Sequence, residues 1–164
     1  MVLEGHSNCI WSLACPVTQQ PLLASAAADS TVKIWDTRPH SRTHLRASFT
    51  FRDDDATDEC VNPTCVTWDW DGRGIIVGWE NAFVELWDVE KGVPTLKLTS
   101  TDPAGIPTVC LSRKLMGEPD KSTLVNCFVK HPSERLVIAG YEDRNIRIFD
   151  TRSGTPSSSQ SALY

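Results

Sequence analysis

The stretch Val32-Lys33-Ile34-Trp35-Asp36 decides the fold, because the same pattern returns twice further along the chain. The two later copies are Val84-Glu85-Leu86-Trp87-Asp88 and Ile146-Arg147-Ile148-Phe149-Asp150. Each copy alternates apolar and polar residues and ends in an aromatic-aspartate pair, a pattern typical of a half-buried β-strand. We therefore expect the chain to be built from a repeated β unit.

Two further β-prone runs precede each copy. In the first unit they lie at 10–15 and 22–26, and the turn residue Asp29 separates them from the closing strand. A fourth, outer strand is expected after each unit. Gly5-His6 opens the first unit and Trp35-Asp36 closes it, which is the paired signature of WD40 repeats. The predicted fold class is all-β: a WD40 β-propeller fragment of about three four-stranded antiparallel blades in an incomplete, open propeller.

The whole chain of 164 residues is expected to form one partial propeller. We place the blade units at about 5–52, 60–99 and 122–154, and we expect a disordered, Ser-rich tail over 155–164. Three blades leave two apolar blade faces without a neighbour. We therefore expect a truncated piece of a longer protein, prone to aggregation when expressed alone.

Four residues of the first unit are predicted to form a buried structural tetrad joined by hydrogen bonds: His6, Ser25, Asp29 and Trp35. A buried indole N–H and a buried imidazole both need partners, and the aspartate would orient the histidine. The same residue types suit a hydrolase triad. Their places in the repeat, however, put them inside the blade, and no Gly-x-Ser-x-Gly elbow exists. We predict no catalytic residues and a protein that is not an enzyme.

The second and third units depart from this pattern. Trp87-Asp88 and Phe149-Asp150 are predicted to close these blades, but neither unit has a Gly-His pair ahead of it. Asn81 replaces the turn aspartate of the second unit, and Phe149 cannot donate a hydrogen bond. We expect both blades to rely on apolar packing.

An aromatic residue followed by a glutamate stands two residues before the turn residue in both of these units. Trp79-Glu80 and Tyr141-Glu142 would lie at the end of the blade that faces the rim of the central channel. These four residues are candidate partner-binding residues for a basic or apolar peptide. The alternative is that the aromatic side chains pack in the core.

Composition narrows the partners and the compartment. The net charge is −5, which argues against nucleic acid. The six cysteines form no C-x-x-C pair, so no metal site and no cofactor are expected. The first residues lack a signal peptide, and no run is long enough for a membrane span. A cytoplasmic setting with protein partners fits best.

The chain resembles the WD40 propeller of the striatin family. Gly5-His6 and Trp35-Asp36 carry part of the likeness, and His131-Pro132 followed by Glu142-Asp143-Arg144-Asn145-Ile146-Arg147-Ile148-Phe149-Asp150 carries the most specific part. The similarity covers roughly 3–154. It implies a non-catalytic scaffold that docks partners in assemblies of a type 2A protein phosphatase with sterile-20-like kinases. No heptad run is present, so the coiled-coil dimerisation of that family is not implied here.

A second function class remains open, that of substrate receptor for a cullin-4 ubiquitin ligase. Trp35-Asp36-Thr37-Arg38 and Phe149-Asp150-Thr151-Arg152 both resemble the aromatic-Asp-x-Arg box of such receptors. The plainer interpretation is that each arginine pairs with the aspartate beside it.

Overall fold

The computed structural model describes residues 1–51, 61–81, 83–98, 124–142 and 144–152, together with the backbone of 156–161. These residues form three antiparallel four-stranded sheets and contain no helix. The predicted all-β class, with three blades in an open arrangement, is confirmed.

Each blade is a simple meander in which consecutive strands pair. Blade 1 consists of β1 (Ile10–Ala14), β2 (Leu22–Ala27), β3 (Thr31–Asp36) and β4 (Leu45–Thr50). Blade 2 consists of β5 (Pro63–Trp68), β6 (Gly74–Trp79), β7 (Val84–Asp88) and β8 (Val93–Leu98). Blade 3 consists of β9 (Val125–Lys130), β10 (Leu136–Tyr141), β11 (Asn145–Asp150) and β12 (Pro156–Ser161).

The strand β12 corrects one expectation. We predicted a disordered tail over 155–164, but the backbone of Pro156–Ser161 pairs with β11 along its length. The physical reason is that strand pairing is made by backbone groups, which serine supplies as well as any residue. The edge of β11 offers a ladder of such groups, and its pairing outweighs the weak β-propensity of serine.

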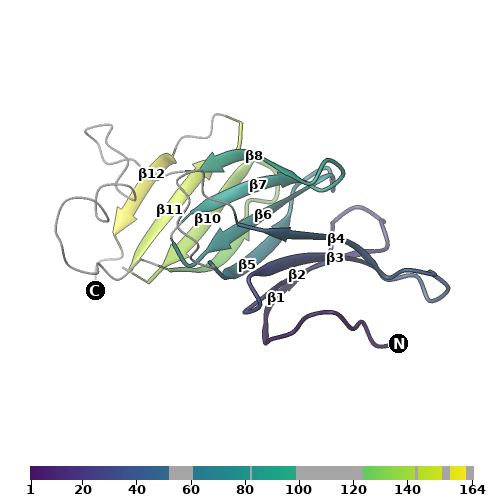
Figure 1. Cartoon of the computed structure of the whole chain (residues 1–164). Helices are drawn as coiled ribbons and strands as arrows, with labels where there is room; N and C mark the ends of the chain where they lie inside the picture. The colour runs from purple at the N-terminus through teal and green to yellow at the C-terminus, as the bar shows by residue number, and fades with distance from the viewer. Residues whose placement is uncertain (52–60, 82, 99–123, 143, 153–155, 162–164) are drawn as a thin grey trace.

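The three blades stack with blade 2 in the middle (Figure 1). Its inner strand β5 contacts β1, β2 and β3 on one side and β9 on the other. Two tryptophans tie the stack together through hydrogen bonds between blades. Trp68 Nε1 donates to the Ala14 carbonyl oxygen at 2.8 Å, and Trp70 Nε1 donates to the His131 carbonyl oxygen at 3.0 Å. Blade 2 is therefore bonded to both of its neighbours.

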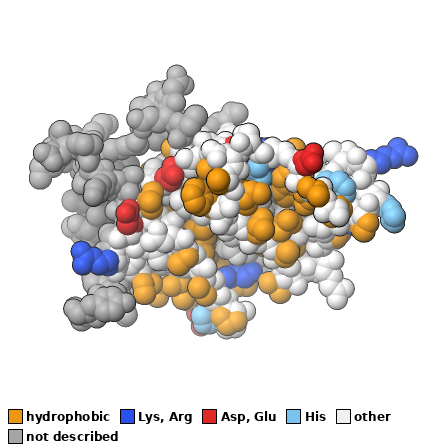
Figure 2. All heavy atoms as spheres, turned by 90° about the horizontal axis from the view of Figure 1, so that it is seen from below, with side chains coloured by type: hydrophobic (Ala, Val, Ile, Leu, Met, Phe, Trp, Pro, Cys, Tyr) orange, Lys and Arg blue, Asp and Glu red, His pale blue; other side chains and the backbone are white. Residues whose placement is uncertain are grey.

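The outer faces of blades 1 and 3 leave large apolar side chains in contact with solvent. Trp11 is 62% exposed and Leu13 is 60% exposed on β1, while Val129 is 61% exposed on β9. Figure 2 shows hydrophobic side chains, in orange, spread over the surface of one face of the molecule. Trp11 therefore lies outside the apolar core.

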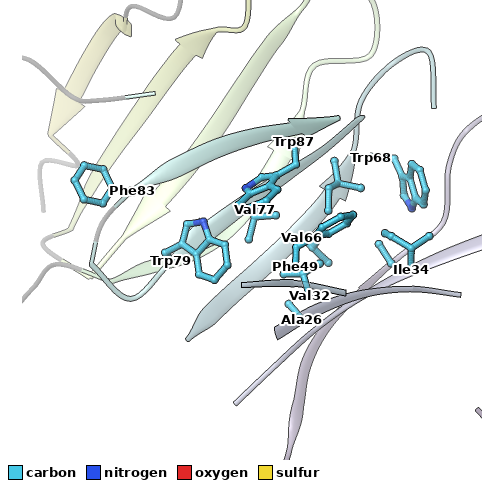
Figure 3. Close-up of a cluster of buried hydrophobic side chains, with 12 residues drawn as sticks. Ala26, Val32, Ile34, Phe49, Val66, Trp68, Val77, Trp79, Phe83 and Trp87 are labelled. Atoms are coloured by element: carbon cyan, nitrogen blue, oxygen red, sulfur yellow. The ribbon is translucent and has the colours of Figure 1, made fainter. Parts of the chain in front are cut away.

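The apolar core lies between blades, in two clusters. Figure 3 shows the larger one, between blades 1 and 2, where Ala26, Val32, Ile34 and Phe49 face Val66, Trp68, Val77, Trp79, Phe83 and Trp87. The second lies between blades 2 and 3 and includes Cys65, Ile76, Val84, Val137, Tyr141 and Phe149. A blade thus buries its apolar residues against the next blade, as repeat architectures require.

Candidate functional site

Hydrogen bonds join the four predicted tetrad residues of blade 1. Trp35 Nε1 donates to Ser25 Oγ at 2.7 Å, and Ser25 Oγ lies 2.6 Å from His6 Nε2. The other ring nitrogen, His6 Nδ1, lies 2.8 Å from Asp29 Oδ2. The structure therefore places the indole, the hydroxyl, the imidazole and the carboxylate in one continuous row.

The carboxylate sets the direction of this row. An ionised carboxylate only accepts hydrogen bonds, so His6 Nδ1 carries the proton that it donates to Asp29. In the neutral imidazole His6 Nε2 is then an acceptor, and Ser25 donates its own hydroxyl proton to it. Burial raises the pKa of Asp29, but hydrogen bonds from Thr31, Ser7 and His6 outweigh this and hold it well below its usual range.

The same geometry argues for a structural role of the row. Ser25 is 1% exposed, and its oxygen already accepts the Trp35 N–H. The side chains of His6 and Asp29 are nearly as well covered. A nucleophile must reach a substrate, and Ser25 Oγ is enclosed within the blade.

Blade 2 satisfies its closing tryptophan in a different way. The strand register makes Val77 the equivalent of Ser25, so no hydroxyl is available there. Instead Trp87 Nε1 donates to Glu85 Oε2 at 3.0 Å, and both side chains are buried. We had expected apolar packing alone. The sequence could have predicted this bond, because Glu85 and Trp87 are two residues apart in one strand and therefore share a face.

Blade 3 closes on Phe149, which is fully buried and needs no acceptor. The aspartate after each closing aromatic has a separate task in all three blades: its Oδ1 accepts backbone N–H groups of the following turn. Asp36 accepts from Arg38, Asp88 from Glu90 and Lys91, and Asp150 from Arg152. The aspartates thus fix the turns that follow the closing strands.

The two candidate aromatic side chains for partner binding are buried. Trp79 is fully buried in the core cluster between blades 1 and 2, and Tyr141 is buried between blades 2 and 3. Their rings fill the space between blades, as the alternative of core packing has it, and the partner-binding role of Trp79, Glu80, Tyr141 and Glu142 stays a prediction. Of the two glutamates, Glu142 is exposed, while Glu80 Oε2 accepts a hydrogen bond from Asn62 at 2.9 Å.

The β3–β4 loop is a surface that the sequence reasoning missed. Between 38 and 46 this loop and the first residues of β4 carry three arginines and two histidines: Arg38, Arg42, Arg46, His40 and His44. We call these five residues the basic loop. No carboxylate occurs between Asp36 and Asp53, so the loop is locally cationic although the chain is acidic overall. The clustering of one charge sign over nine residues was the available signal.

Asp36, at the end of β3, holds the start of the basic loop in place through hydrogen bonds from Arg38. Its side chain is buried, and the Arg38 guanidinium hydrogen-bonds both carboxylate oxygens. These bonds from Arg38 hold the pKa of Asp36 well below its usual range. The arginine of the first aromatic-Asp-x-Arg box is thus engaged inside the chain, as its plainer interpretation requires. Arg42 remains exposed, and Arg46 reaches Asp36 only at 3.9 Å.

Comparison with known proteins agrees with this architecture. Residues 1–36 and 110–150 match the WD40 family, described as "WD domain, G-beta repeat". Human Striatin-4 is 32% identical over 94% of this chain. Mouse Striatin-3 and human Striatin are each 26% identical over 93% of it. The chain belongs to the WD40 repeats of the striatin family.

This striatin-type chain spans only a small part of those relatives, 18% of human Striatin-4 and 17% of mouse Striatin-3. The WD40 match includes Gly5-His6 and Trp35-Asp36 of blade 1, and it omits blade 2, whose closing tryptophan uses Glu85. The similarity points to a protein-interaction scaffold family. Among the described residues no helix is long and apolar enough to cross a membrane.

Proposed function

We propose that this chain is a non-catalytic, cytoplasmic scaffold segment that docks protein partners, and that the basic loop is its contact surface. The partners we propose are components of phosphatase and kinase assemblies of striatin type, following the resemblance described above. Nucleic acid is not among the proposed partners, since the chain carries a net charge of −5.

The proposal rests on a contrast between two sets of polar groups in blade 1, those paired inside the blade and those exposed beside its β3–β4 loop. The polar groups that could perform chemistry are paired within blade 1, as the bonds of Ser25 illustrate. The basic loop, in contrast, presents Arg42 to solvent from the loop and Arg46 from the start of β4, next to the turn at Arg38 that Asp36 fixes. Binding residues commonly lie on surface loops that a rigid scaffold holds in position.

The chemistry of the basic loop selects acidic partners. Arginine forms forked, charge-assisted hydrogen bonds with carboxylates and phosphates. A partner segment rich in Asp or Glu, or carrying phosphoserine or phosphothreonine, would complement this loop. The proposed role therefore requires that the docked component of the kinase and phosphatase assembly carry such a segment.

Co-purification tests the proposal. The tagged 164-residue chain is expressed in cells, and recovery of a type 2A phosphatase and a sterile-20-like kinase is measured by immunoblotting. The double substitution Arg42→Glu with Arg46→Glu is expected to reduce recovery at least about tenfold, since like charges across an interface repel. Recovery by the unmodified chain is also expected to fall as salt rises, because exposed charges are screened.

The matched control is Arg73→Glu with Lys91→Glu, which makes the same change of net charge on turns of blade 2, where both residues are exposed. This variant is expected to recover both enzymes normally. Equal losses in the two double variants would show that net charge, and not the basic loop, governs recovery. Failure of the unmodified chain to recover either enzyme would contradict the proposed function.

A further inference from the structure

The hydroxyl of Ser41 lies in the middle of the basic loop, three residues after an arginine, in the sequence Arg38-Pro39-His40-Ser41-Arg42. The residues on both sides, 38–40 and 42–43, are exposed, and Ser41 itself is half-buried. The Arg38 side chain is 60% exposed although it is bonded to Asp36. Protein kinases select substrates by the pattern of charges around the acceptor hydroxyl. The pattern around Ser41 is that of a substrate for an arginine-directed kinase.

The turn that carries Ser41 can open without disturbing the blade. Ser41 N donates to the Arg38 carbonyl oxygen at 3.1 Å, and Ser41 Oγ lies 3.0 Å from the Thr43 carbonyl oxygen. Both bonds lie within the loop, between the end of β3 and the start of β4. Ser48, in contrast, lies inside β4, where it pairs with Lys33 of β3. A kinase can therefore draw out the segment around Ser41 at the cost of local loop contacts.

Ser41 also faces the buried carboxylate that holds the loop. Ser41 Oγ lies 3.4 Å from Asp36 Oδ2, the same oxygen to which the Arg38 guanidinium donates. Arg46 Nη1 lies 3.9 Å from this oxygen as well. One carboxylate oxygen is thus approached by a hydroxyl and by two guanidinium groups. A negative charge added at Ser41 Oγ comes to lie beside Asp36 and within reach of both arginines.

We propose that Ser41 is a phosphorylation site for an arginine-directed serine/threonine kinase, and that its phosphorylation opens the turn held by Asp36. The kinase transfers the γ-phosphoryl group of ATP to Ser41. A bond forms between the γ-phosphorus and Ser41 Oγ, and the bond from this phosphorus to the β,γ-bridging oxygen breaks. The hydroxyl proton passes to the catalytic base of the kinase, and ADP leaves.

The effect on the loop follows from charge. The phosphoryl group adds a charge of about −1.5 to −2 at neutral pH, and it repels the Asp36 carboxylate beside it. It attracts Arg38 and Arg46, because arginine binds phosphate through forked hydrogen bonds. Arg38 therefore leaves Asp36, and the turn loses the bonds that fix it. Much of the positive charge of the basic loop is offset, so acidic partners are released. This last step alone rests on the proposed function.

Phosphorylation of the full chain tests the site. The purified chain is incubated with ATP and the catalytic subunit of cyclic-AMP-dependent protein kinase, and mass spectrometry of its peptides locates the product. We expect the phosphoryl group on Ser41, and an initial rate of incorporation at least about fivefold lower in Ser41→Ala. Ser133→Ala is the matched control and is expected to react normally, because Ser133 follows Lys130, whose Nζ is bound to the Trp68 carbonyl oxygen. Absence of phosphate from Ser41, wherever else it occurs, would overturn the proposal.

Amide hydrogen exchange, followed by NMR, tests the opening of the turn without any partner. The amide of Arg38 is bonded to Asp36 Oδ1, and the amide of Ser41 to the Arg38 carbonyl oxygen. Both are expected to exchange at least about fivefold faster in the phosphorylated chain. The amide of Glu90, which Asp88 holds in the same way in blade 2, is the control and should not change. Unchanged exchange at Arg38 and Ser41 would contradict the opening.

Recovery of the phosphatase and the kinase from cell lysate tests the release of partners, with an inhibitor of serine/threonine phosphatases present. Recovery by the tagged chain is expected to fall at least about fivefold after phosphorylation, whereas Ser41→Ala treated with the same kinase should recover both enzymes as before. Equal recovery before and after phosphorylation would overturn the release. If the unmodified chain recovers neither enzyme, the proposed function fails, while peptide mapping and amide exchange still decide the inference about Ser41.

Discussion

At the scale of single residues, the Ser25 hydroxyl shows how a WD40 blade uses a polar group. It accepts a hydrogen bond from the buried indole N–H of Trp35 and donates a hydrogen bond to the imidazole of His6. Each neighbour is itself covered, so none of these groups has water as an alternative partner. A buried donor that loses its acceptor bears the full cost of its desolvation.

Ser25→Ala is therefore expected to lower the free energy of unfolding by about 1–3 kcal/mol, because the Trp35 N–H loses its acceptor. Urea denaturation followed by circular dichroism measures this change. The control Ser7→Ala also removes a hydroxyl, but at an exposed residue whose backbone N–H bonds Asp29, and it is expected to change stability by less than about 0.5 kcal/mol. An unchanged stability of Ser25→Ala would contradict the role given to this hydroxyl.

Stability is also expected to fall in acid. The pKa values of Asp29 and Asp36 are lowered in the folded chain, so the unfolded chain takes up protons first as the pH drops. Their stabilising contribution is thus fully present above about pH 5 and is lost progressively below about pH 4. Urea midpoints measured across this range test the prediction. Asp29→Asn should show a shallower acid decline than the unmodified chain, starting from a lower stability at neutral pH.

At this scale the sequence could predict side chains that join one another by complementary hydrogen-bonding groups. It could not predict which face of a strand a neighbouring blade covers. His6, Ser25, Asp29 and Trp35 have complementary hydrogen-bonding groups, and the structure joins them. Burial of Trp79, in contrast, depends on which face of a strand a neighbouring blade covers. An apolar residue at either face gives the same pattern, so the alternation alone cannot distinguish them.

At the scale of the blade, the repeat is conserved in shape while the group that closes it changes. Ser25 serves Trp35 in blade 1, Glu85 serves Trp87 in blade 2, and Phe149 needs no acceptor in blade 3. The order and number of strands could be predicted because each blade repeats the same turn and alternation signals. The strand β12 could not be predicted, because it is held by backbone hydrogen bonds to β11, and a serine-rich sequence gives no side-chain pattern that indicates a strand.

Glu85→Ala is expected to destabilise the chain by about 1–3 kcal/mol, because the buried Trp87 N–H loses its acceptor. Glu85→Gln keeps an acceptor oxygen and is expected to cost less. Denaturation by urea compares the two variants with Glu90→Ala, an exposed residue of the neighbouring turn. Equal effects of alanine and glutamine at position 85 would show that charge, rather than the bond to Trp87, matters there.

At the scale of the whole molecule, blade stacking depends on close approach at the inner strands. Gly78 permits Phe128 and Val125 to sit against β6, and a Cβ at this position would come within 2.9 Å of both. Contacts that short force neighbours to move, and these two neighbours belong to blade 3, while Cys65 Sγ of blade 2 itself would lie at 2.7 Å. The close packing of blades 2 and 3 at this point therefore depends on the absence of a side chain at Gly78.

Gly78→Ala is expected to lower the free energy of unfolding by about 1–3 kcal/mol, and Gly140→Ala by clearly less. Among the residues that the structure describes, the alanine at 140 would press only on Cys127 Sγ, which belongs to an exposed side chain that can rotate. Urea denaturation measures both variants against the unmodified chain. A larger loss at 140 than at 78 would contradict the packing described for blades 2 and 3.

The indole bonds from Trp68 and Trp70 have a consequence for the order in which the chain comes apart. Because these two rings fasten the central blade to both flanks, opening that blade breaks bonds on two sides, whereas a flanking blade can separate by breaking one set. Amide protons of β6 and β7 should accordingly outlast all others in deuterium exchange, and transient openings should begin at the two extremities of the stack. The sturdiest portion of the chain would then be the one whose sequence departs furthest from the WD40 consensus.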